Sequence, residues 1–236
     1  MPAMLTTLLH YTRYLHIAAG FIGFFVAPVA LAVRKGGPAH RRWGKVFFWA
    51  MVVAGSTAIL NASFKGLTFL LLTGIFSLYL AVFGYRSLYQ KHLGVGRDAG
   101  ARPALADWLL VSAGLLVFGG TLVYGLIYKV VPSMIFGLIG VLLTGRQLAG
   151  FRRRGPWPAG QWLLNHMSGF VGAYIAAVSA FSATSLHFIP WPWNFLWPTL
   201  VLVPPLVWVS RRYKTRFAQG QRPADAVEVR IQPTMA

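Results

Sequence analysis

The stretch WLLVSAGLLVFGGTLVYGLIY, residues 108–128, is followed by the single residue Lys129 and then by VVPSMIFGLIGVLLTGRQLA, residues 130–149. Each of these two segments is apolar over about 20 residues, the length of α-helix that crosses the roughly 30 Å hydrocarbon core of a bilayer. A connection of one residue leaves room only for a tight turn. The pair therefore predicts a transmembrane helical hairpin.

Five more segments of the same kind occur along the chain, and Lys65-Gly66 alone separates two of them, which predicts a second tight hairpin. The sequence thus predicts an all-α integral membrane protein, a bundle of seven transmembrane helices. Residues 1–213 would form one domain, and residues 214–236 a polar, disordered tail. The seven predicted spans cover Leu9 to Val33, Val46 to Phe64, Leu67 to Tyr85, Trp108 to Tyr128, Val130 to Ala149, Trp162 to Phe188 and Trp193 to Ser210.

The composition supports a membrane protein. Of the 236 residues, 56% are hydrophobic and only 11% are charged, whereas about 25% of an average soluble domain is charged. The net charge is +18, but the basic residues interrupt apolar runs instead of covering a polar surface, so nucleic acid is not an expected partner. The chain has no cysteine, which excludes an iron–sulfur cluster and Cys-ligated zinc.

The basic residues also predict an orientation. All Lys and Arg except Arg13, Lys65 and Lys129 fall in the loops after the first, third and fifth spans, at the ends of those spans, or in the tail. Positively charged loops stay on the cytoplasmic side. We therefore expect the N-terminus outside and the C-terminus in the cytoplasm, with anionic inner-leaflet headgroups as lipid partners.

Two further absences limit the function. The seventh predicted span has no lysine, so it offers no Schiff-base residue for retinal. The predicted spans contain no Asp or Glu, which argues against a carboxylate-driven pump.

Ionisable residues inside membrane helices are functional candidates because burying them is costly. In the first span, His10, Arg13 and His16 recur at intervals of three, and small residues continue the same face. This face is expected to pack inside the bundle. His10 and Arg13 would reach the outer headgroups, whereas His16 lies roughly 9 Å deeper by helical rise.

The sixth span carries a longer stripe, which runs from His166 to His187 along Gly and Ala residues. We interpret it either as a packing seam or as a groove with a polar group at each end. In the inner stretch 36–42, before the second span, Pro38 is placed to open a helix, and His40 would lie at the cytoplasmic interface. The neighbouring Arg41 and Arg42 suit a lipid phosphate, a haem propionate or a nucleotide, or simply anchor the helix.

These residues resemble a family of bacterial multi-pass membrane proteins that is defined only as a domain of unknown function. The resemblance covers about Leu15 to Tyr213 and implies a bacterial inner (cytoplasmic) membrane, but no activity. Its motifs here are His16, Gly20, Pro28, Lys35-Gly36, His40-Arg41, Gly44, Gly84-Tyr85-Arg86, His166-Met167, Gly172-Ala173-Tyr174-Ile175-Ala176-Ala177, Ala180-Phe181 and Leu196 to Thr199.

The histidines favour a redox function, with a b-type haem or a metal ion held between helices and electrons exchanged with quinone. A haem in a bundle needs two His on different helices at similar depth. His16, or His10, with His187 would form an outer pair that could also hold a metal ion, and His166 with His40 an inner pair. Arg13 or Arg41 would meet the propionates.

Two other classes of function stay open. The small-residue faces and the basic inner face also suit a transporter or channel for a small or anionic solute. A non-enzymatic scaffold or lipid-binding protein fits equally. Small-residue stripes allow a homo-oligomer. No catalytic residue is assigned, and the sequence does not decide whether the protein is an enzyme.

Overall fold

The computed structural model describes residues 3–93, 102–153 and 157–223. All seven α-helices in this part of the chain are long and apolar enough to cross a membrane, which confirms the predicted all-α bundle. The elements are α1 (Ala3–Ala32), α2 (Pro38–Lys65), α3 (Thr68–Arg86), the 3-10 helix η1 (Ser87–Gln90), α4 (Leu105–Tyr128), α5 (Val131–Phe151), α6 (Gln161–Ser185) and α7 (Trp193–Ala218).

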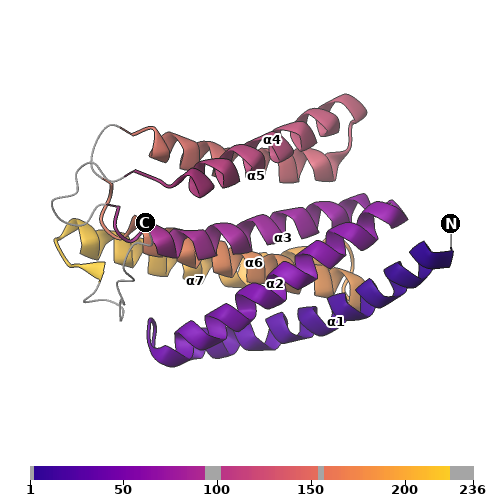
Figure 1. Cartoon of the computed structure of the whole chain (residues 1–236), viewed down its shortest axis with the longest axis horizontal. Helices are drawn as coiled ribbons and strands as arrows, with labels where there is room; N and C mark the ends of the chain where they lie inside the picture. Colours follow the sequence, from indigo (N-terminus) through magenta and orange to yellow (C-terminus); the bar gives the residue numbers. More distant parts are fainter. Residues whose placement is uncertain (1–2, 94–101, 154–156, 224–236) are drawn as a thin grey trace.

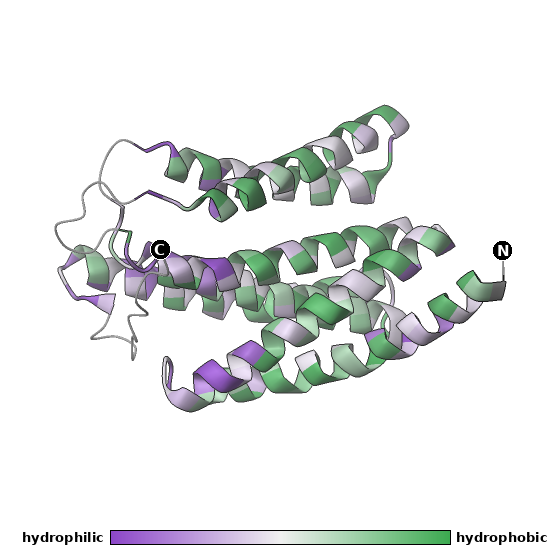
Figure 2. Cartoon of the chain, viewed as in Figure 1, coloured by the Kyte–Doolittle hydropathy of each residue, from purple (hydrophilic) through white to green (hydrophobic). Residues whose placement is uncertain are grey.

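The helices end at two opposite ends of the bundle (Figure 1). The C-terminal ends of α1, α3, α5 and α7 share one end, which we call the basic end. The start of α1 and the turns after α2, α4 and α6 share the opposite end. Hydrophilic residues gather toward the basic end, whereas the middle of the bundle is largely apolar (Figure 2). Which end faces the cytoplasm stays a prediction.

Both predicted tight hairpins are confirmed. Gly66 ends α2 in the left-handed conformation (φ 65°), which glycine adopts without strain. Lys129 takes the same conformation at the end of α4 (φ 55°). Pro38 opens α2 directly after Gly37, as expected for a residue that lacks a backbone N–H.

The helices pack mainly as sequence neighbours. α1 packs on α2, α2 on α3 and α4 on α5, whereas α6 lies between α3 and α7. The α4–α5 hairpin contacts the rest of the bundle mainly through α3, where the Tyr79 and Phe76 rings contact Phe118. The buried apolar core comprises Ala27, Phe47, Met51, Tyr79, Leu80, Ala81, Phe83, Phe118 and Ala173.

The seventh helix is longer than predicted. It continues past Ser210 to Ala218, because Phe217 is buried against Trp162 and Leu163 of α6. The predicted start of the polar tail at residue 214 therefore lies inside a helix. Residues 224–236 of that tail lie outside the described part.

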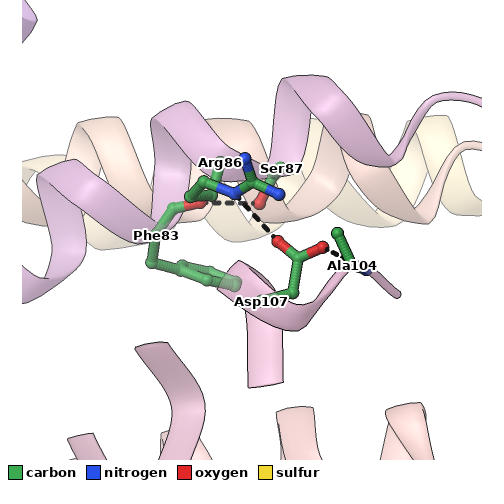
Figure 3. A network of polar contacts seen from close by, with 5 residues as sticks. All are labelled: Phe83, Arg86, Ser87, Ala104 and Asp107. Carbon is green, nitrogen blue, oxygen red and sulfur yellow. Dashed lines mark hydrogen bonds and ion pairs between the residues drawn. The ribbon is translucent and has the colours of Figure 1, made fainter. Parts of the chain in front are cut away.

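The expectation that the spans contain no acidic residue is wrong. α4 begins at Leu105, so its first turn includes Asp107, whose side chain is only 3% exposed. One carboxylate oxygen accepts a hydrogen bond from Nε of Arg86 on α3 at 3.0 Å, and the other accepts one from the backbone N–H of Ala104 at 3.0 Å (Figure 3). Asp107 thus caps α4 and pairs it with α3.

Candidate functional site at the basic end

Two glycines bring α3 and α6 into close contact. A Cβ atom added to Gly169 would lie 2.5 Å from the Cα atom of Gly84. The predicted small-residue stripe of the sixth span therefore serves as a packing seam at this point. His166 lies one turn before Gly169, so the same contact brings its ring to α3.

The backbone of α3 fixes the orientation of His166. Its Nδ1 atom lies 3.0 Å from the carbonyl oxygen of Gly84. Because a carbonyl oxygen can only accept, Nδ1 donates the proton. In the neutral ring, Nε2 then keeps a free lone pair.

His40 is held in the same way from another side. It lies in the first turn of α2, and its Nδ1 donates to the carbonyl oxygen of Ala30 on α1 at 2.9 Å. The ring centroids of His40 and His166 are 6.3 Å apart and the ring planes are nearly perpendicular, at 80°. The structure thus brings together the two residues of the predicted inner pair.

The Nδ1–carbonyl bonds of His40 and His166 are of a kind that metal-ligating histidines also make. Such residues almost always donate the N–H of the non-ligating nitrogen to a carbonyl or carboxylate, which fixes the tautomer. An imidazole nitrogen lies about 2 Å from its metal ion, so the ring centroids of two opposed ligands are separated by slightly more than about 6 Å. The measured 6.3 Å agrees with that separation.

The surroundings of the pair are apolar on one side and open on another. The Phe170 ring lies 4.6 Å from the ring of His166 and 5.4 Å from Phe47, which is 2% exposed. Gly44 lies one turn after His40, and a Cβ atom added there would meet nothing within 4 Å. A side chain at position 44 would therefore meet open space one turn along α2 from His40.

Three cationic side chains lie near the pair. Lys35 belongs to the α1–α2 connection and donates to the backbone oxygen of Leu31, and Arg41 donates to that of Gly36. Burial lowers the pKa of Lys35. Burial and, less strongly, the nearby charge of Arg41 lower the pKa of Lys91, which follows η1.

These cations have no carboxylate beside them in the described residues. The acidic side chain described there, Asp107, is already paired with Arg86. The Lys91 ammonium instead lies 5.3 Å from the centre of the Trp162 ring. Half-buried cations whose pKa values are lowered would gain from an anionic group placed among them.

Arg42, the other predicted anion-binding residue, lies apart from this cluster. Its side chain is exposed and borders a shallow depression with Pro38 and Trp43. That position suits a lipid headgroup at the surface.

The structure does not bring the predicted outer residues together as it does His40 and His166. His16 is half-buried and its Nδ1 donates to the carbonyl oxygen of Ala54 on α2 at 2.9 Å. His187 is exposed in the α6–α7 connection. Within the described ranges, neither a hydrogen bond nor a ring contact links it to His16. Arg13 is exposed, and so is His10, which packs edge-on against Tyr14.

His16 and His40 also hold the first hairpin together. Each donates from the helix that carries it to a backbone carbonyl of the other helix, His16 to Ala54 and His40 to Ala30. The two bonds belong to the same antiparallel register, since the residue numbers of each pair add to the same total.

Sequence reasoning did not identify three residues of the site. Lys91 was counted only as a loop charge, Gly84 appeared only within the motif Gly84-Tyr85-Arg86, and Phe170 was only part of an apolar span. Gly84 is a small residue near the end of the third predicted span, a residue type that permits close helix packing. No sequence signal indicated that its partner would be Gly169.

Comparisons with family models, with curated proteins and with solved structures find no match for this chain. The family resemblance therefore stays a prediction.

Proposed function

We propose that this polytopic membrane protein is a redox protein that holds a b-type haem between α2 and α6, with His40 and His166 as the axial ligands. The observation that carries the proposal is the pair itself. Two rings on different helices lie 6.3 Å apart, each with Nδ1 bonded to a backbone carbonyl and Nε2 left for a metal ion.

Haem fits a site with two histidines better than a bare ion does. Zinc takes four ligands, whereas the porphyrin itself supplies four ligands to its iron and leaves two axial positions. Haem also carries two propionates, which Lys35, Arg41 and Lys91 would neutralise. Held by His40 and His166, a haem would supply electron transfer.

The test is the visible spectrum of the full chain, produced with ample haem and purified in detergent. The wild type is expected to show a Soret band and to gain a sharp α-band on reduction with dithionite. His40→Ala and His166→Ala should each lose the α-band change. His187→Ala, which alters an exposed histidine, is the matched control and should keep it.

Other results of these spectra would contradict the haem proposal or move the site. A well-folded wild type without a Soret band overturns the haem proposal. Loss of haem from His16→Ala and His187→Ala, but not from the inner variants, would move the site to the opposite end. Gly44→Leu adds an independent check, because its side chain would enter the open space beside His40. This variant should fold and bind less haem.

A further inference from the structure

A second polar cluster lies between α1 and α2 near the opposite end of the bundle. It consists of Thr12 and His16 on α1 and of Thr57 and Asn61 on α2. Thr57 is buried, and the other three side chains are half-buried. The function proposed above does not use this cluster.

The hydrogen bonds of Asn61 leave its side-chain oxygen unsatisfied. Its Nδ2 donates to the hydroxyl of Thr12 at 3.1 Å and to the backbone carbonyl oxygen of Thr57 at 2.8 Å. Since a carbonyl oxygen can only accept, the second bond fixes which end of the amide is nitrogen. Oδ1 is buried, and no donor reaches it from the described residues.

The rest of the cluster has no donor to offer. The Thr12 hydroxyl donates to the backbone of the preceding turn at 3.0 Å, and the Thr57 hydroxyl does the same at 2.6 Å. His16 donates from Nδ1 to the carbonyl oxygen of Ala54. With Nδ1 as the donor, Nε2 is the acceptor of the same ring.

A buried acceptor without a donor, such as Oδ1 of Asn61, is costly inside a membrane. Water is scarce there, and a buried polar group without a partner costs several kcal/mol. The cluster therefore favours the binding of a molecule that carries hydroxyl groups as hydrogen-bond donors. His16 contacts Thr57, and Asn61 lies one turn further along α2, so the two residues are offset by about one helical turn. A ring with a hydroxyl group at each end can present one donor to each residue.

We propose that His16 and Asn61 form a binding site for the head group of a membrane-soluble hydroquinone. One hydroxyl would donate to Nε2 of His16 and the other to Oδ1 of Asn61. The site needs no metal and is separate from the His40–His166 pair. Ala54, which binds His16, lies 14 residues beyond His40 on α2, roughly 21 Å by helical rise.

The test compares two probes on the purified full chain under anaerobic conditions. The first is a decyl-substituted hydroquinone, and the second is its dimethyl ether, which has the same ring and tail but no O–H donor. We expect the hydroquinone to raise the thermal unfolding midpoint saturably and the ether to leave it unchanged. Asn61→Leu should weaken hydroquinone binding about tenfold.

Asn165→Leu is the matched control, because Asn165 is a half-buried asparagine of α6 that already accepts a bond from Gln161. It should bind the probe as the wild type does. Equal responses to both probes, or no response of the folded wild type to either, would overturn the proposal. If Asn61→Leu does not fold, the two probes on the wild type still decide. The haem spectrum of Asn61→Leu should equal that of the wild type, so the two proposals fail separately.

Discussion

At residues 84 and 169 the backbones of α3 and α6 meet, and no side chain fits between them. Gly169→Ala would place its methyl group 2.5 Å from the Cα atom of Gly84. The helices would have to separate, so we expect a loss of about 1–3 kcal/mol in the free energy of unfolding. Thermal unfolding in detergent measures it. Gly20→Ala is the control, because nothing lies within 4 Å there, and it should be neutral or slightly stabilising.

The Arg86–Asp107 pair gives a second prediction. Asp107→Asn removes the only negative charge beside Arg86 in the described structure and leaves a cation near the membrane interface. Arg86 is 25% exposed, so solvent limits the loss to about 1–3 kcal/mol. Chemical unfolding followed by circular dichroism measures this loss. Replacing both partners, Arg86→Met with Asp107→Leu, should recover part of it, and no recovery would show that the pair does not act as a unit.

At the scale of single residues, the sequence predicted which residues belong to the site better than it predicted the groups that those residues contact. His40 and His166 were paired from their depth alone, and the structure brings them together. The hydrogen bonds that orient them go to backbone carbonyls of Ala30 and Gly84, which no side-chain pattern reveals. Asp107 was placed outside its span because the apolar run begins at Trp108, whereas the helix starts one turn earlier and uses the carboxylate as its cap.

At the scale of helices and hairpins, the link between α3 and the α4–α5 hairpin is testable. The Tyr79 hydroxyl donates to Oε1 of Gln147 at 2.9 Å. Tyr79→Phe and Gln147→Leu should each destabilise the protein, and a double-mutant cycle should give a coupling energy of about 0.5–1.5 kcal/mol. Unfolding of the two single variants and the double variant in detergent measures it. Additive effects would mean that this bond contributes nothing.

Helix boundaries could be predicted where the chain itself imposes a stop. Gly66 and Lys129 end their helices in the left-handed conformation, and both positions were expected as turns. The end of α7 could not be predicted, because residues 211–218 are polar in sequence. They stay helical because Phe217 is buried on α6, a tertiary contact that local hydropathy does not contain.

For the molecule as a whole, the distribution of charge predicts an orientation that labelling can test. The chain has no cysteine, so single-cysteine variants need no prior substitution. In intact cells, Lys129→Cys is expected to react with a membrane-impermeant maleimide. Arg152→Cys, in the connection at the basic end, should react only after the membrane is opened. The reverse pattern would invert the predicted topology.

The choice of helix neighbours is the part of the fold that the sequence left open. In a membrane every face of a helix is apolar, so periodicity does not distinguish the face toward lipid from the face toward another helix. Glycines that admit a close approach decide it here. The stripe on the sixth span indicated a seam, but that it packs on α3 became evident only from the structure.

The two histidine–carbonyl bonds between α1 and α2 have a mechanical consequence. Because both belong to one register, sliding either helix by a single residue, or rotating it about its own axis, would break both bonds at once. The two bonds therefore oppose sliding of α1 along α2. Rearrangement within the membrane is then easier at α4–α5, where an ion pair, a side-chain hydrogen bond and a few ring contacts hold the hairpin to α3.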